Sequence, residues 1–179
     1  MKYAIIIQAR MGSSRLPNKV LKKINGQTLI ELLIKRLLGS KLIEDIIFAI
    51  PKSSANNILS NHIISKGLKV FKGSENNVLG RYYQCAKKYN VKNIIRITSD
   101  CPVSDIKIIE KLIKKFKLSD LDYISNTMPP SFPDGLDVEI FTYKSLETAN
   151  KYAKSTFDKE HVTSYIRNSS KFKKYNLRN

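Results

Sequence analysis

Residues 8–19 read Gln-Ala-Arg-Met-Gly-Ser-Ser-Arg-Leu-Pro-Asn-Lys and directly follow the apolar run Tyr3 to Ile7. The apolar run predicts a buried strand, so residues 8–19 become the loop at its carboxyl end. A loop can bind an anion where glycine exposes backbone N–H groups and where hydroxyl groups and cations surround them. The residues that provide these groups are Arg10, Gly12, Ser13, Ser14, Arg15 and Lys19.

The residues of this loop predict a polyphosphate-binding site, but their pattern differs from the two common phosphate-binding loops. It lacks the Gly-Lys-Ser/Thr ending of a P-loop and the GxGxxG of a dinucleotide-binding turn. Pro17 stiffens its far side, which suits a loop that holds its shape before a ligand arrives. A solvated basic connection that binds nothing remains the alternative.

Strand and helix patterns alternate through the rest of the chain. Thr28 and Glu31 form a capping-box pattern that begins a helix, and residues 45–50 are a second apolar strand. A strand, a helix and a strand joined by short links predict a βαβ unit with a parallel strand pair. Because the pattern recurs, we expect an α/β fold in three layers, with a doubly wound, mostly parallel sheet.

Composition places limits on the class of protein. The 179 residues, 42% of them hydrophobic, predict a single domain over residues 1–179. No signal-peptide pattern or membrane-spanning apolar segment is found, so we expect a cytoplasmic protein with its two cysteines reduced. The 32 lysines and arginines exceed the 15 acidic residues, a net charge of +17, but they are scattered along the chain. Nucleic-acid binding is therefore a minor hypothesis.

A carboxylate follows the strand predicted over residues 91–98. Asp100 lies in Ser99-Asp100-Cys101-Pro102, and ligands of open α/β sheets bind at the carboxyl ends of strands. Asp100 can therefore bind a divalent metal ion. An Asx turn that caps the helix expected from Ser104 is the alternative that the residues alone leave open.

Two later segments carry polar groups. Asp134, Asp137 and Glu139 lie within six residues of each other, where a turn and a half-exposed strand are the plain interpretation. Glu160 and His161 lie in a helical pattern, where they could form an acid–base pair or bind sugar hydroxyl groups. A histidine packed on an amphipathic helix is the alternative.

Several segments, in order from Ile5 to about Ile166, resemble motifs of the sugar-acid cytidylyltransferases. This family contains the SpsF-like proteins and the enzymes that make CMP-activated 3-deoxy-octulosonate and sialic acids. Asn18, Asn77, Gly80 and Ser99 depart from its usual residues. The matching segments are IIQARMGSSRLPNKVL, GSENNVLGRYYQCA, RITSDCPVSD, PDGLDVE and EHVTSY.

The resemblance implies a fold of the nucleotide-diphospho-sugar transferase type and a CTP-dependent transfer of CMP to a sugar acid, with release of pyrophosphate, in cell-surface polysaccharide or glycan biosynthesis. It implies Mg²⁺ as cofactor, bound by Asp100. The implied roles are catalysis for Arg15, Lys19 and Asp100, nucleotide binding for Gln8, Ala9, Arg10, Gly12, Ser13, Ser14, Ser74 and Arg81, and sugar binding for Asp134, Asp137, Glu139 and His161.

The chain lacks one further family motif. Family members continue past the EHVT-like segment into a strand with an Arg-x-Thr-Val-Asp pattern, which has no counterpart here. We therefore expect an abbreviated member with an uncovered sheet edge or core face, which makes a homodimer a candidate assembly. An incomplete, catalytically weak nucleotide-binding protein is the alternative function.

Overall fold

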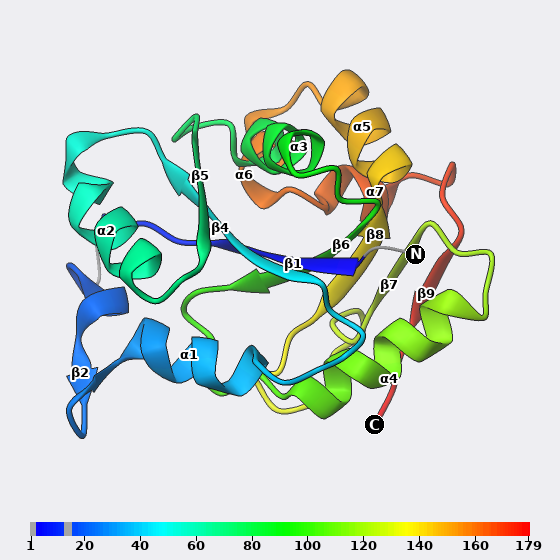
Figure 1. Cartoon of the computed structure of the whole chain (residues 1–179). Helices are drawn as coiled ribbons and strands as arrows, with labels where there is room; N and C mark the ends of the chain where they lie inside the picture. The colour runs from blue at the N-terminus through cyan, green and yellow to red at the C-terminus, as the bar shows by residue number, and fades with distance from the viewer. Residues whose placement is uncertain (1–2, 13–15) are drawn as a thin grey trace.

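The computed structural model describes residues 3–12 and 16–179, and a seven-stranded sheet forms its centre (Figure 1). The strand order is β5-β4-β1-β6-β8-β7-β9. The strands are β1 (Tyr3–Gln8), β4 (Asp45–Pro51), β5 (Lys69–Gly73), β6 (Asn93–Thr98), β7 (Tyr123–Ser125), β8 (Glu139–Thr142) and β9 (Lys174–Asn176), and a separate hairpin contains β2 (Lys23–Ile24) and β3 (Gln27–Thr28).

The sheet is mostly parallel, as the sequence predicts. Strand β1 pairs in parallel with β4 and β6, and β4 pairs in parallel with β5. Strand β8 is antiparallel to both β6 and β7, while β9 is parallel to β7. The α-helices are α1 (Leu29–Leu37), α2 (Asn57–Ser65), α3 (Val78–Lys88), α4 (Ile106–Lys117), α5 (Tyr143–Tyr152), α6 (Thr156–His161) and α7 (Ser164–Asn168).

Helices cover both faces of the sheet, because successive residues of a strand point to opposite sides. Ile5 and Ile7 of β1 pack in one core with α1, α2 and α4, whereas Ala4 and Ile6 pack in a second core with α3, α5 and α7. Figure 1 shows α1 and α4 below the sheet and α3 and α5 above it. The three-layer α/β prediction is confirmed.

Local signals predicted some helix starts correctly and others wrongly. The Thr28–Glu31 capping box is present, and Asn77 caps α3 by accepting from the Gly80 N–H at 2.8 Å. Ser54 is a residue type that favours a helix cap, and its position predicts the start of α2. It does not cap that helix, because residues 54–56 form a 3-10 turn and α2 begins at Asn57. Helix α4 begins at Ile106, and its cap is Asp105, whose side chain accepts from the Lys107 N–H.

One prediction about the C-terminal half is wrong. Glu139 is not on a half-exposed strand: it is 4% exposed, because β8 is paired on both sides and covered by helices. Strand β9 pairs with β7 from Lys174 to Asn176 and is the last strand of the sheet on that side, and the uncovered edge or core face expected from the sequence stays a prediction. Within the described ranges, no helix has the length and apolarity needed to cross a bilayer.

Candidate active site

A cleft of about 710 Å³ opens at the carboxyl ends of β1 and β6, where ligands bind in open α/β sheets. One half is formed by the loop after β1 and the start of α3, and the other half by α6. The lining residues are Gln8, Ala9, Arg10, Gly12, Leu16, Lys19, Val20, Glu75, Asn76, Val78, Arg81, Arg96, Thr98, Ser99, Asp100, Thr156, Glu160 and His161.

The loop after β1 is closed by backbone contacts and by one buried side chain. The Asn18 N–H donates to the Met11 carbonyl at 3.2 Å, and the Met11 N–H donates to Asn56 Oδ1 at 2.9 Å. Asn18 has φ 57°, a left-handed conformation that asparagine tolerates better than most residues. The bond to Met11 also explains why the Asn56 side chain does not cap α2.

Gly12 and Asn18 differ in backbone conformation. Gly12 lines the cleft, but its φ lies outside the left-handed region, and no described atom lies within 4 Å of a Cβ placed on it. Asn18, not Gly12, makes the left-handed turn. The predicted ligands Ser13, Ser14 and Arg15 lie outside the described residues, so their roles stay predictions.

Lys19 and Asp100 meet at the cleft although 81 residues separate them. Lys19 Nζ lies 3.1 Å from Asp100 Oδ2, and the two side chains are 31% and 51% exposed. Partial burial raises the pKa of Asp100, but hydrogen bonds from Thr98 and Lys19 and the Lys19 charge outweigh it, so the pKa falls below its usual value. Asp100 is therefore a carboxylate at neutral pH.

Arg81 links the start of α3 to the preceding turn. Its side chain is 4% exposed, and Nη1 donates to the carbonyl oxygens of Ser74 and Glu75. A Cβ on Gly73 would lie 2.9 Å from Arg81 Cγ, so glycine permits this close approach. Burial lowers the pKa of Arg81. Ser74 Oγ accepts from the Asn77 N–H at 3.1 Å and is not in the lining.

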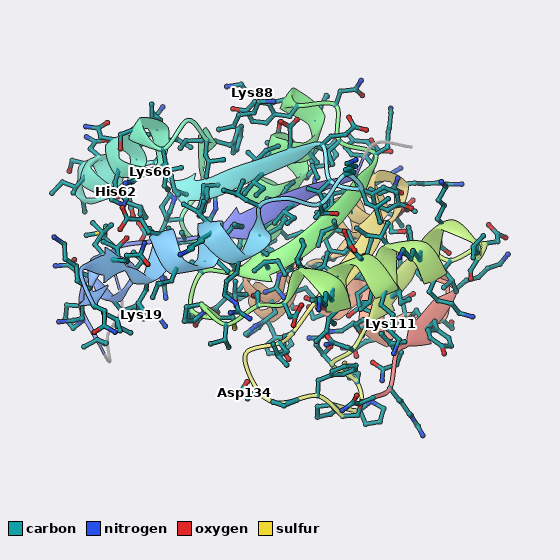
Figure 2. The ribbon with its side chains drawn as sticks, turned by 60° about the horizontal axis from the view of Figure 1, so that its bottom comes forward. Lys19, His62, Lys66, Lys88, Lys111 and Asp134 are labelled. Atoms are coloured by element: carbon teal, nitrogen blue, oxygen red, sulfur yellow. The ribbon has the colours of Figure 1, made fainter. Side chains whose placement is uncertain are left out.

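The predicted sugar-side residues do not all reach the cleft. His161 lines it, together with Glu160 and Thr156 of α6, and its ring lies 4.3 Å from that of Phe157. Asp134 and Asp137 are exposed and not in the lining. Figure 2 shows Asp134 on a projecting loop, well apart from Lys19. Sugar binding by these two carboxylates stays a prediction.

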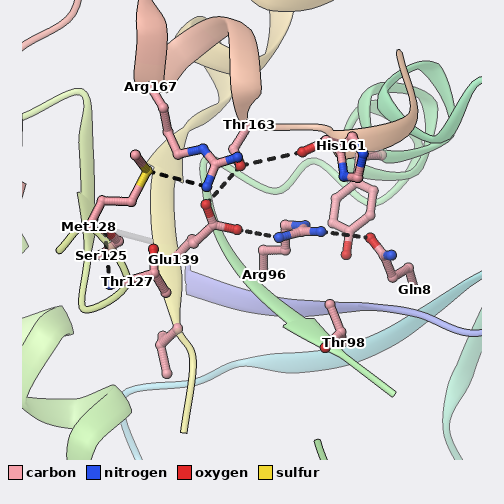
Figure 3. Close-up of polar contacts among 12 residues, drawn as sticks. Gln8, Arg96, Thr98, Ser125, Thr127, Met128, Glu139, His161, Thr163 and Arg167 are labelled. Atoms are coloured by element: carbon pink, nitrogen blue, oxygen red, sulfur yellow. Dashed lines mark hydrogen bonds and ion pairs between the residues drawn. The ribbon is translucent and has the colours of Figure 1, made fainter. Parts of the chain in front are cut away.

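Glu139 lies beneath the cleft in a buried polar network (Figure 3). It pairs with Arg96 through Oε2, and its Oε1 accepts from Tyr123 at 2.6 Å and from Thr163 at 2.7 Å. Burial raises the pKa of Glu139, but the Arg96 charge and these hydrogen bonds outweigh it, so the net shift is downward. A carboxylate bonded in this way is not positioned to receive a sugar hydroxyl group.

Arg96 is the lining residue that sequence reasoning missed. A signal was present: an arginine inside Asn93–Thr98, a strand with mostly apolar neighbours, is almost never buried without a partner. The partner could not be identified, because Glu139 lies 43 residues further along the chain.

The metal prediction was checked against the donor set. Among residues 3–12 and 16–179, no three His, Cys, Asp or Glu side chains are grouped so that they could bind a metal ion. Mg²⁺ in nucleotide sites is usually bound by one or two carboxylates together with phosphate oxygens and water. Asp100, ionised and in the lining, fits the role of a single protein ligand of that kind.

A cleft of this kind, at the strand ends of a mostly parallel sheet and lined by a basic loop and an ionised aspartate, is typical of nucleotide-binding α/β proteins. The model of the cytidylyltransferase family matches residues 4–178, and the chain belongs to this family.

Relatives and solved structures agree with this assignment. The chain is 34% identical over 170 residues to the spore coat polysaccharide biosynthesis protein SpsF of Bacillus subtilis, covering 91% of this chain and 69% of that one. It is 35% identical over 120 residues to the 3-deoxy-manno-octulosonate cytidylyltransferase of Fusobacterium nucleatum, covering 65% and 47%. A cytidylyltransferase structure from Leptospira borgpetersenii superposes with a TM-score of 0.95 at 33% identity, over 100% of this chain and 76% of that chain.

Proposed function

We propose that this protein transfers CMP from CTP to a hydroxyl oxygen of a sugar acid, releases pyrophosphate, and supplies a nucleotide sugar for cell-surface polysaccharide or glycan biosynthesis. One observation carries the proposal: the basic loop after β1 and Asp100 after β6 converge on one cleft through the Lys19–Asp100 pair. SpsF, by its name, supports the polysaccharide context, and the cytidylyltransferase of F. nucleatum supports a sugar acid as acceptor.

The reaction requires alignment and charge neutralisation. The acceptor oxygen forms a bond to the α-phosphorus, the bond from that phosphorus to its bridging oxygen breaks, and the hydroxyl proton passes to solvent. Most of the rate enhancement in such transfers comes from positioning and electrostatic stabilisation.

The residues of the nucleotide half supply these effects. Arg10 and Lys19 neutralise the charge on the β- and γ-phosphates, the backbone N–H of Gly12 donates to their oxygens, and Arg15 and the two loop serines join them. Gln8, Ala9 and Arg81 bind the rest of the nucleotide, with Ser74 shaping the adjoining turn. Asp100 would hold a Mg²⁺ ion, which supplies further charge neutralisation at the phosphates.

Pyrophosphate release tests the proposal. Each of the four nucleoside triphosphates is incubated with Mg²⁺ and a panel of sugar acids that includes 3-deoxy-manno-octulosonate and N-acetylneuraminate. We expect release with CTP and a sugar acid together, and neither substrate should suffice alone. Release with another nucleotide in preference to CTP, or with neutral sugars only, would contradict the proposal.

A further inference from the structure

Arg96 is a cation that lines the cleft and has no role in the proposed binding of the nucleotide. It belongs to β6, its side chain is 17% exposed, and it lines the cleft between Gln8 and Glu139. Nη2 donates to Gln8 Oε1 at 3.2 Å, and Nη1 pairs with Glu139 Oε2. Figure 3 shows the guanidinium between these two partners.

The two members of this ion pair differ in their remaining bonding capacity. Glu139 is almost fully buried and already accepts from Arg96, Tyr123 and Thr163. A guanidinium has five N–H donors, and the described hydrogen bonds of Arg96 use two of them. Of the remaining donors of Arg96, the one on Nε is buried and has no partner, and the others belong to the two Nη atoms. The pair therefore has donors to spare, and they belong to the side chain that lines the cleft.

The position of Arg96 points to the acceptor half of the cleft. Arg10 and Lys19 belong to the loop after β1, and Arg81 belongs to α3, so these three serve the nucleotide half. Arg96 donates to Gln8 at the end of β1 and also pairs with Glu139 of β8, which in turn accepts from Thr163, two residues beyond His161. The same carboxylate thus connects Arg96 and the segment that carries His161 (Figure 3).

We propose that Arg96 binds the carboxylate of the acceptor and that Glu139 is its positioning residue. A planar guanidinium matches a carboxylate with two parallel N–H···O bonds, a geometry that lysine cannot reproduce. The buried Glu139 holds the guanidinium in place before the acceptor arrives, which removes part of the ordering cost of binding. Arg96 thereby selects acids over neutral sugars. This inference rests on the proposed function.

The test compares Arg96→Lys with the parent enzyme. Lysine keeps the charge opposite Glu139, so the variant retains a counter-ion for the buried carboxylate. Arg178→Lys, a change at an exposed residue outside the cleft lining, is the matched control. The first measurement is the KM of the sugar acid that has the highest turnover in the panel. The second is the turnover of the matching neutral acceptor, in which an alcohol replaces the carboxylate. The third is the Kd of CTP.

We expect Arg96→Lys to raise the KM of the acid by roughly 10- to 100-fold. The Kd of CTP should stay within about twofold of the parent value, and the preference for acid over alcohol should shrink, because the bidentate contact is lost. An equal rise in the Kd of CTP would assign Arg96 to the nucleotide phosphates and overturn the inference. An unchanged KM would overturn it as well and leave the proposed function standing.

Glu139→Gln tests the positioning role and keeps the shape of the side chain. We expect a higher KM for the acid with the Kd of CTP unchanged, whereas a purely structural Glu139 would reduce the active fraction and leave the KM of the remaining enzyme unaltered. If the parent enzyme transfers CMP to no sugar acid in the panel, the proposed function fails, and this inference fails with it.

Discussion

One ion pair lies in the cleft lining and another reaches from the lining to Glu139 beneath it, and the two pairs differ in exposure. Lys19 and Asp100 are 31% and 51% exposed, whereas Arg96 and Glu139 are 17% and 5% exposed. Exposed pairs contribute little to stability, since water and salt screen them and long side chains lose entropy when they pair. Breaking a buried pair leaves an uncompensated charge, which costs much more.

The difference in exposure means that the Lys19–Asp100 pair can rearrange when a ligand binds, whereas the Arg96–Glu139 pair keeps its side chains in one arrangement. The Lys19–Asp100 contact can open at little cost, so Lys19 can turn to the phosphates and Asp100 to the Mg²⁺ ion that it would hold. The Arg96–Glu139 contact stays in place and presents the same donors each time an acceptor binds. Five measurements test this difference, and they run from the largest expected effect to the smallest.

Glu139→Ala should give the largest loss of stability. Because it leaves Arg96 buried without a counter-charge, we expect the free energy of unfolding to fall by about 3–5 kcal/mol, measured by urea denaturation. Asp137→Ala, two residues away and exposed, should change it by less than about 0.5 kcal/mol. The double variant Arg96→Met/Glu139→Leu should recover much of the lost stability, because it leaves no unpaired charge. If the double variant were as unstable as Glu139→Ala, the unpaired charge of Arg96 would not be the cause of the loss.

The loss in Glu139→Ala should depend on pH. The folded-state pKa of Glu139 is lowered, so its contribution is fully present above its unfolded-state pKa of about 4.3 and disappears as the pH falls through the folded value. The stability difference between parent and variant should therefore shrink below about pH 4. A difference that stayed constant into acid would mean that the charge of Glu139 does not matter.

Asp100→Asn should affect turnover rather than folding. The amide keeps the shape but removes the charge that would bind Mg²⁺, so we expect Mg²⁺-dependent turnover to fall by about two orders of magnitude. The Tm without ligand should hardly change, because the carboxylate is half exposed, while the extra Tm shift from Mg²⁺ with CTP should diminish. A lower Tm with an undiminished shift would instead indicate a purely structural Asx turn.

Lys19→Ala should weaken nucleotide binding by a smaller amount. The change removes one charge-assisted contact, worth roughly 1.5 kcal/mol or about tenfold in the Kd of CTP measured by calorimetry. Lys23→Ala, a nearby exposed lysine outside the cleft lining, is the control and should bind CTP like the parent. Equal affinities for all three proteins would show that the loop is only a connection.

The coupling between Lys19 and Asp100 should be the smallest effect. A double-mutant cycle on unfolding with Lys19→Met and Asp100→Asn should give an interaction free energy below about 1 kcal/mol. It should decrease further between low and high salt, since the pair is exposed. A coupling of several kcal/mol that salt did not alter would remove the contrast between the two pairs.

The sequence predicted most of the sheet and part of the site. Apolar runs identified β1, β4 and β6, and the capping signals at Thr28 and Asn77 located the starts of α1 and α3. Loop residues at strand ends were predictable, because parallel strands bring their carboxyl ends to one edge. Lys19 and Asp100 line the cleft for this reason, whereas Arg81 and His161 reach it from α3 and α6.

The contacts that support the site were not predictable in the same way. Asn56 looked like part of a helix start, yet its side chain accepts from the backbone of Met11, 45 residues away. Strand β9 has three residues and few apolar ones, so only its pairing with β7 reveals it. Glu139 read as a solvent-facing carboxylate because nothing in the local pattern shows that β8 lies between two other strands.

By itself, the sequence determined most of the strands and helices, because periodicity, turn residues and caps act within a few neighbouring residues. It also determined that a basic loop follows β1 and that Asp100 follows β6. Only the tertiary structure decided which charges meet. The antiparallel register of β6 and β8 places Arg96 opposite Glu139, and the sheet order places both between the two halves of the cleft. Pairing across 43 residues depends on how the whole sheet assembles, which no local pattern specifies.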